Sequence, residues 1–224
     1  ALGRAGSFAG RSAFALRGYA PTPTSRRGTQ VIRFGVERQP SYAWSFDRGD
    51  GWANVGYGEV VRERPDQPPL SRALMLHGLQ ALLPGAAEGA GQWLGHHLPL
   101  SKARFAHPGG PVLFVGDAAG LVNPLTGEGI YYAVATGALA GRCAVEMPSS
   151  PAARYARAVR RLLGWHLRTT TAASALAVHP RLLELGLEAA RADQQTFDDI
   201  VEIGLGRGVP TTRVLSEVMR RATG

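Results

Sequence analysis

The residues best suited to chemistry lie between Val112 and Ile130. Four apolar residues, 112–115, precede Gly116 and Asp117, and a turn rich in glycine then leads into a predicted helix. Ligands of open α/β sheets bind outside the carboxyl ends of the strands, so Asp117 is expected to face a ligand. The free N–H groups at a helix start favour negative charge. The segment therefore suits a ligand with hydroxyl groups beside developing negative charge, such as a sugar-alcohol chain joined to a reducible ring.

The glycines of this segment support the same interpretation. Gly116 and Gly120 let the backbone approach a bulky ligand without a Cβ in the way, and Gly127 and Gly129 do so at the helix start. The alternative is an ordinary strand-to-loop turn with an exposed acid. Glu128 is a favourable acid for the first turn of a helix, and only its backbone is assigned to the ligand.

The elements that must position these residues change in character along the chain. Alternating apolar residues predict strands at 12–19, 29–36, 41–46 and 52–61, with 48–51 as a hairpin turn. Ser71 is the predicted N-cap of a helix that ends near Leu83, and 111–115 is a predicted buried parallel strand. Further helices are predicted at 128–145, 152–170, 180–192, 194–203 and 211–222. The fold class is therefore mixed α and β, with an antiparallel sheet first and a helical end.

Composition limits the kind of protein. The 224 residues are 45% hydrophobic and 19% charged, which excludes a disordered chain. A single cysteine, Cys143, excludes a disulfide scaffold, and no stretch reaches the roughly 18–20 apolar residues of a membrane span. Of the 25 basic residues only Lys102 is a lysine, and no basic run exceeds two residues. The net charge of +8 therefore points to genomic use of arginine rather than to nucleic-acid binding.

The segment at 116–130 resembles the second flavin-binding signature of FAD-dependent oxidoreductases, G-D-A-A-x-x-x-x-P-x-x-G-x-G-[IL], at every fixed position. The resemblance implies FAD as cofactor and an FAD-binding fold. It assigns Asp117 to the ribityl chain of the flavin. The other cofactor-binding residues that it implies are Gly116, Ala118, Pro124, Thr126, Gly127, Glu128, Gly129 and Ile130.

The hairpin at 42–56 resembles the Y-x-W-x-F-P-x-G-D-G-x-x-N-V-G pattern of the geranylgeranyl reductase family, with Asp47 in place of the proline. Such enzymes use reduced FAD to hydrogenate isolated double bonds of long isoprenoid chains. The resemblance places Tyr42, Trp44 and Phe46 along the substrate channel, whereas period-two spacing alone also fits a plain sheet face. It implies an isoprenoid or lipid substrate and electrons from NAD(P)H or ferredoxin. No catalytic acid or base stands out.

A G-x-G-x-x-G unit for the ADP half of FAD is missing, since Gly204-Leu-Gly206-Arg-Gly208 has the wrong spacing. Residues 1–6 resemble the stretch after the first half of the flavin domain. We therefore expect a partial FAD-binding fold, lacking on the order of 130–160 residues. The expected parts are a substrate-binding sheet with a helix at 1–97, the end of the FAD domain at 98–147, and a helical region at 148–224. The alternatives are a flavin-dependent monooxygenase or halogenase, and a non-catalytic fragment of the same fold.

Several other residues carry weaker signals. His96 and His97 are adjacent and have no further ligand nearby, so no metal site is expected. The arginines at 154, 157, 161 and 168 form either a solvated helix face or a contact for a phosphate headgroup or membrane surface. With no secretory signal, the protein is expected in the cytoplasm or at the surface of a membrane.

Overall fold

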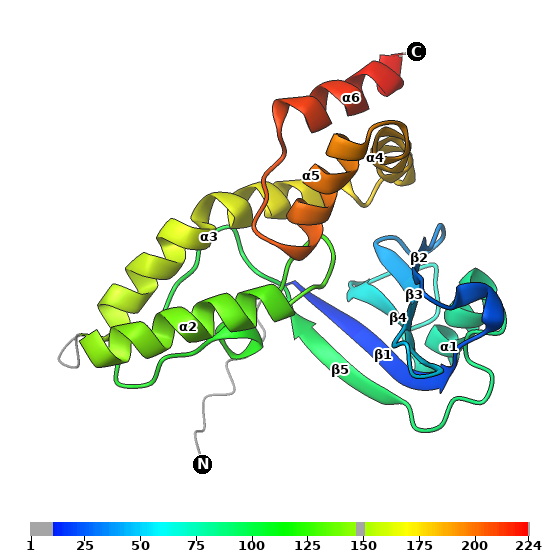
Figure 1. The fold of residues 1–224 in the computed structure, drawn as a ribbon, viewed down its shortest axis with the longest axis horizontal. Helices are drawn as coiled ribbons and strands as arrows, with labels where there is room; N and C mark the ends of the chain where they lie inside the picture. Colours follow the sequence, from blue (N-terminus) through cyan, green and yellow to red (C-terminus); the bar gives the residue numbers. More distant parts are fainter. Residues whose placement is uncertain (1–10, 147–150, 224) are drawn as a thin grey trace. The chain divides into compact units, whose positions relative to one another are not determined.

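A computed structural model describes residues 11–146 and 151–223 of the chain. These residues form two compact units. One is Ser12–Leu98, called here the sheet unit, and the other is Arg11 with the described residues from Pro99 onward, called the helical unit (Figure 1). The resemblance at residues 1–6 lies outside the described residues. In the described part of the chain, no helix combines the length and apolarity that crossing a bilayer requires.

The sheet unit contains five strands in the order β2-β3-β4-β1-β5. The pairs β1–β4, β3–β4 and β2–β3 are antiparallel, as the alternation of apolar residues predicts. The strands are β1 (Ser12–Pro21), β2 (Gln30–Phe34), β3 (Ser41–Asp47), β4 (Trp52–Val61) and β5 (Leu94–Pro99). Strand β5 has no counterpart among the strands predicted from the sequence, and four of its six residues are exposed, so its burial does not alternate.

Helix α1 (Arg72–Leu82) covers one face of this sheet. The Ser71 hydroxyl accepts a hydrogen bond from the Leu74 N–H (3.2 Å), which confirms the predicted N-cap. Met75 and Leu79 are buried, one helical turn apart, and pack on β-strand residues of alternate register such as Val55. The residues that alternate with these along each strand, such as Trp44 and Gly56, lie on the opposite face of the sheet.

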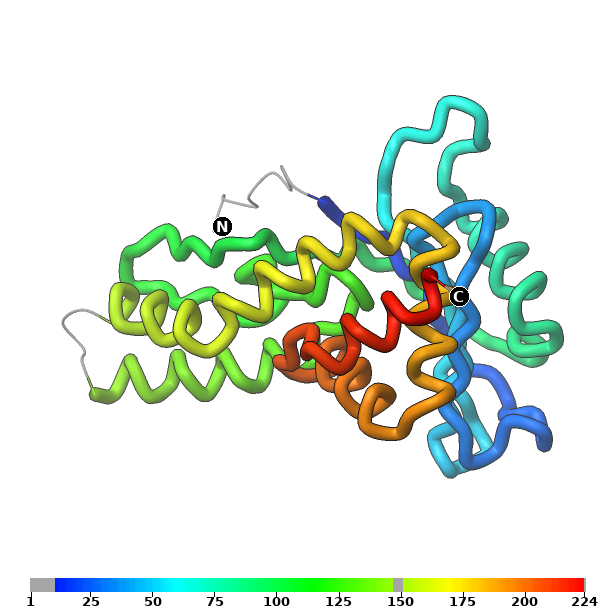
Figure 2. Tube along the Cα trace, turned by 90° about the horizontal axis from the view of Figure 1, so that it is seen from above, coloured from blue at the N-terminus to red at the C-terminus, as the bar shows by residue number. Residues whose placement is uncertain are grey.

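The helical unit is built around two long helices, α2 (Ile130–Glu146) and α3 (Pro151–Leu176), which run side by side (Figures 1 and 2). Tyr155, Val159 and Leu163 of α3 are buried against Tyr132 and Cys143 of α2. The shorter helices pack on one another and are α4 (Pro180–Ala192), α5 (Gln194–Leu205) and α6 (Thr212–Thr223). The predicted helices of this region are all present, with α3 extending six residues beyond the predicted end at 170.

The segment 111–115 differs from its prediction. Val115 has extended dihedral angles (φ −127°, ψ 158°), but no described strand pairs with the segment, and Val112 is 43% exposed. One of its carbonyls, that of Phe114, accepts a hydrogen bond from the Tyr155 hydroxyl (2.8 Å). The prediction of a buried parallel strand is therefore wrong for the described chain, because a strand needs a neighbour to pair its backbone.

Candidate functional site

Asp117 lies on a single turn of 3₁₀ helix, Gly116–Ala119, that follows the extended segment. Gly120 then adopts the left-handed conformation (φ 66°), and its N–H donates a hydrogen bond to the Asp117 carbonyl (2.9 Å). Leu121 N–H donates to the Gly116 carbonyl (3.0 Å). The backbone around Asp117 is thus fixed by local hydrogen bonds, while the residue itself is exposed. Such an acid is available to a ligand.

Gly116 is required by its packing against α2. Its φ of +49° is unfavourable for a side chain, and an added Cβ would lie 2.9 Å from the Ala133 Cβ. Its N–H donates to the Thr136 hydroxyl (3.1 Å), which in turn donates to the Tyr132 carbonyl (2.6 Å). The end of the extended segment is therefore held directly on the second turn of α2.

Gly129 lies immediately before α2 and beside the Asp117 carboxylate. An added Cβ here would lie 2.9 Å from Asp117 Oδ1. The absence of a side chain thus leaves room for the carboxylate next to the helix start, where partial positive charge favours it. Asp117 and Gly129, twelve residues apart in the signature, are thus neighbours in the structure.

The loop between Asp117 and Gly129 is bonded to the end of α5, a distant part of the chain. The Asn123 carbonyl accepts from Gly127 N–H (2.8 Å), and the Asn123 side-chain amide donates to the carbonyls of Ile203 (2.8 Å) and Gly204 (3.1 Å) at the end of α5. The Thr126 hydroxyl also donates to the Gly204 carbonyl (2.8 Å). Asn123 is buried and was not singled out from the sequence, because it occupies a variable position of the signature and its partners lie about 80 residues away.

The remaining signature residues lie on the same loop and helix start. Pro124 is buried, Ala118 is exposed, and Ile130 is 74% exposed. The Glu128 carboxylate accepts from the Ile130 N–H (2.5 Å), so this side chain caps the first turn of α2. Of the backbone N–H groups at 127–130, three are thus already bonded within the chain: that of Gly127 to the Asn123 carbonyl, that of Glu128 to the Thr126 hydroxyl (3.4 Å) and that of Ile130 to the Glu128 carboxylate.

In the sheet unit, Tyr42, Trp44 and Phe46 lie on the sheet face opposite α1. Their rings form a row, with centroid distances of 5.7 Å from Tyr42 to Trp44 and 6.4 Å from Trp44 to Phe46. Phe34 of β2 extends the row, 6.1 Å from Tyr42. The face is thus a continuous aromatic surface, as period-two spacing predicts.

The other fixed residues of the hairpin pattern hold the Trp44 ring. Its indole N–H donates to Asn54 Oδ1 (3.0 Å) on the neighbouring strand. An added Cβ at Gly56 would lie 2.3 Å from a ring carbon of Trp44 and 2.4 Å from the Leu16 carbonyl oxygen. Asn54 and Gly56 of the N-V-G part therefore provide a hydrogen bond and a bare backbone for the indole, whereas Val55 packs in the core with α1.

Asp47, which replaces the proline of the family pattern, has a structural role. Its carboxylate accepts hydrogen bonds from Gly28 N–H (2.6 Å), the Thr22 hydroxyl (2.8 Å) and Gly49 N–H (3.4 Å). These bonds, that from Gly28 above all, lower the pKa of Asp47 below its ordinary value. The departure from the pattern is thus accommodated by a carboxylate that ties the hairpin turn to the loop after β1.

A buried ion pair lies at the end of β4. Glu59 is 3% exposed and forms a two-point contact with Arg38, 2.8 Å from each of two guanidinium nitrogens. The Tyr57 hydroxyl donates to the same carboxylate (3.2 Å), and Arg64 lies 3.9 Å away. The carboxylate is therefore compensated on several sides, as a buried charge requires. Nothing in the sequence pattern paired these residues.

The histidines at 96 and 97 are exposed, and the His97 ring packs edge-on against Phe14 at 4.7 Å. Within residues 11–146 and 151–223, no group of three His, Cys, Asp or Glu side chains could hold a metal ion. Cys143 is buried in the core between α2 and α3, as a small apolar residue.

Comparison with known proteins identifies relatives along much of the chain. A menaquinone reductase of Mycolicibacterium smegmatis is 32% identical over 161 residues, which cover 68% of this chain and 38% of that protein. A digeranylgeranylglycerophospholipid reductase of Methanopyrus kandleri is 36% identical over 122 residues, 52% of this chain and 31% of that protein. The chain belongs to the geranylgeranyl reductase family. No family model matches the chain.

The fold of the family member agrees with a solved structure. The crystal structure of a geranylgeranyl bacteriochlorophyll reductase-like protein of Thermoplasma acidophilum covers 94% of this chain with a TM-score of 0.62 and 20% sequence identity. The chain spans about half of that protein (51%), and the matched segments span 31–38% of the two curated relatives. The mixed α/β class predicted from the sequence is confirmed.

Proposed function

We propose that this family member is part of an FAD-dependent oxidoreductase that reduces isolated carbon–carbon double bonds of a long isoprenoid or lipid substrate. One observation carries the proposal: the Asp117 carboxylate is exposed beside Gly129, at the start of α2, where the flavin signature requires it. The names of the relatives, which refer to menaquinone and to a digeranylgeranyl lipid, support a hydrophobic substrate.

The residues around Asp117 fit a flavin. A hydroxyl of the ribityl chain can donate to the exposed carboxylate, a charge-assisted bond worth roughly 1.5–3 kcal/mol. The absence of a Cβ at Gly129 leaves the helix start open beside it. Gly116, Ala118, Pro124, Thr126 and the backbone of residues 127–130 complete the proposed set.

FAD, when bound, supplies the hydride for the reduction. The chain's own contribution is to hold the cofactor and to favour negative charge near the start of α2, where backbone N–H groups point away from the helix. Glu128 occupies one of these groups, that of Ile130, and so limits the positions at which the helix can meet the ring. The proton donor is a tyrosine hydroxyl or water.

The aromatic row of the sheet unit is the proposed wall of the substrate channel. Trp44 is fixed by the Asn54 hydrogen bond and by the bare backbone at Gly56, and it is buried, whereas Tyr42 and Phe46 are half-buried and offer the accessible apolar area. Tyr42 and Phe46 flank it at ring distances near 6 Å. A flat aromatic row binds an isoprenoid chain through its large apolar area without requiring directional contacts.

Residues 98–147 are proposed as the carboxyl-terminal part of the FAD-binding domain, with residues 1–97 for the substrate and 148–224 as a helical region. Two surfaces of this part support the assignment. The extended segment 112–115 lacks a pairing strand in the described chain, and α2 exposes apolar side chains, Ile130 by 74% and Val134 by 68%. Both are the kind of surface that the remaining strands and helices of such a domain cover.

The test is flavin retention by the full-length protein carrying Asp117→Ala. We expect FAD to bind roughly 10- to 100-fold more weakly, measured as the flavin-to-protein absorbance ratio after gel filtration. Asp50→Ala is the matched control, since Asp50 is also an exposed acid and forms a surface pair with Arg48 (3.0 Å). Equal flavin content in both variants would contradict the assignment. Anaerobic saturation of a prenyl double bond, rather than oxygen-dependent hydroxylation, tests the reaction type.

A further inference from the structure

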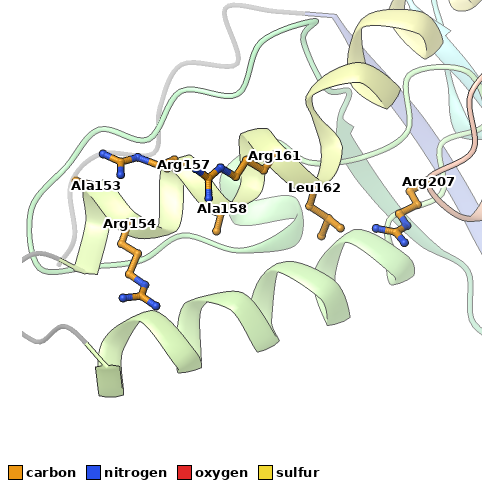
Figure 3. A pocket seen from close by; sticks show the side chains of 7 residues that line it. All are labelled: Ala153, Arg154, Arg157, Ala158, Arg161, Leu162 and Arg207. Atoms are coloured by element: carbon orange, nitrogen blue, oxygen red, sulfur yellow. The ribbon is translucent and has the colours of Figure 1, made fainter.

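Four arginines line one groove of the helical unit. The groove has a volume of about 670 Å³ and is lined by Ala153, Arg154, Arg157, Ala158, Arg161, Leu162 and Arg207. Arg154, Arg157 and Arg161 follow one another at spacings of three and four residues, which places them on one face of α3. Arg207 comes from the loop after α5 (Figure 3). The groove, called here the arginine groove, thus takes three arginines of the predicted stripe, adds a distant one and omits Arg168.

The charge of the groove is largely uncompensated within the protein. Arg154 forms an ion pair with Glu146 at the end of α2. Among the described residues, no acid forms an ion pair with Arg157, Arg161 or Arg207. Like charges that line one groove repel one another, and an anion that binds between them reduces that repulsion.

The loop that carries Arg207 is rigidly built. The N–H groups of Gly206 and Gly208 both donate to the Glu202 carbonyl, at 3.1 and 2.9 Å. An added Cβ at Gly208 would lie 2.8 Å from the backbone of Glu202, so the tight turn requires glycine. The two glycines of the Gly-Arg-Gly sequence therefore set the position of Arg207 at the edge of the groove.

A buried pair fixes the same loop to the long helices. The His166 Nδ1–H donates to the Gly208 carbonyl (2.5 Å), and His166 Nε2 accepts from the Tyr132 hydroxyl. The tautomer follows from the partners, since a carbonyl can only accept. Burial lowers the pKa of His166, so the ring is neutral and the contact persists at neutral pH. One side chain of α3, that of His166, thus connects the loop to α2 and α3. This contact fixes the loop that carries Arg207 relative to the helix that carries the other arginines.

We propose that the arginine groove binds a phosphate-bearing group, with a diphosphate or a phosphate ester as the chemical class. Planar guanidinium groups match phosphate oxygens with two parallel hydrogen bonds, and the volume accommodates a group of this size. The group can belong to a soluble diphosphate or to a lipid headgroup. The proposal is independent of the flavin assignment, because none of its residues belongs to the flavin signature.

The test is calorimetric titration of the 224-residue chain with inorganic pyrophosphate at low ionic strength. We expect Arg157→Ala/Arg161→Ala to weaken binding at least roughly tenfold. Arg160→Ala/Arg168→Ala is the matched control, because it removes two exposed charges from the same helix but outside the groove. The control should change affinity by less than about twofold. Absent pyrophosphate binding, or equal losses in the two double variants, would overturn the proposal.

Two further measurements complete the test. Arg207→Ala should weaken pyrophosphate binding several-fold, which a simple charged stripe on α3 would not produce, and this variant leaves α3 intact. Sedimentation with phosphatidylglycerol and with phosphatidylcholine vesicles distinguishes the sources. Binding to the anionic vesicles that is lost in Arg157→Ala/Arg161→Ala identifies a lipid headgroup. Pyrophosphate binding without vesicle binding identifies a soluble diphosphate. Neither readout requires FAD, so failure here is distinct from failure of the proposed function.

Discussion

Gly56 of the sheet unit and Gly129 of the helical unit both lie where an added Cβ would meet another atom at less than 3.0 Å. At Gly56 the nearest atoms belong to a held indole ring and to the backbone oxygen of Leu16, neither of which can move cheaply. At Gly129 the nearest atom is the end of the exposed Asp117 side chain. The same residue type thus protects packing in one unit and leaves room for an exposed carboxylate, that of Asp117, in the other.

The buried polar groups of the two units differ in a similar way. The sheet unit buries a charge, Glu59, and surrounds it with Arg38, Arg64 and the Tyr57 hydroxyl. In the helical unit, Asn123 and His166 are buried as neutral groups that bond to backbone carbonyls. Substitutions at the buried ion pair of the sheet unit are therefore expected to lower the free energy of unfolding more than substitutions around the candidate site of the helical unit.

Gly56→Ala should give the largest effect on stability. The added methyl cannot be accommodated between the Trp44 ring and the Leu16 carbonyl, so we expect a loss of about 3 kcal/mol in the free energy of unfolding. Urea unfolding followed by near-ultraviolet circular dichroism measures it. Gly58→Ala on the same strand is the control, since its nearest contact would be 3.7 Å, and should cost far less. Similar losses in both would show that strand propensity, rather than the indole, sets the cost.

Arg38→Met should destabilise the sheet unit by about 2–3 kcal/mol. Removal of the guanidinium leaves the buried Glu59 carboxylate with only the Tyr57 hydroxyl and Arg64 at 3.9 Å, and an uncompensated buried charge is costly. The double variant Arg38→Met/Glu59→Gln should recover part of the loss, measured by the same urea unfolding. A double variant no more stable than the single one would contradict this account of the pair.

Gly129→Ala should have the smallest effect on stability, under about 1 kcal/mol, because the exposed Asp117 side chain can rotate away. In the full-length protein it should nevertheless lower flavin content, since the carboxylate would be displaced from the helix start. Gly137→Ala, with no atom within 4 Å of its added Cβ, is the control and should retain flavin. If both variants hold the same amount of flavin, the position of Asp117 beside Gly129 has no role in binding it.

Much of the fold was predictable because periodicity encodes it locally. The four strands from Ser12 to Val61 and the Ser71 N-cap follow from alternation and from capping chemistry, both of which act between residues close in sequence. Strand β5 and the unpaired segment at 111–115 were not predictable in the same way, because both depend on which neighbour is present to accept backbone hydrogen bonds.

Residue types and their order along the chain predicted the candidate site: an acid after an apolar run, glycines at a helix start, and aromatic residues at alternate positions. How these groups are held depends on the tertiary structure. It placed Asn123 on the end of α5, Trp44 on Asn54 and Gly56, and Arg207 beside the arginines of α3. Residue type limits what a group can do, whereas contacts between distant segments exist only once the chain has folded.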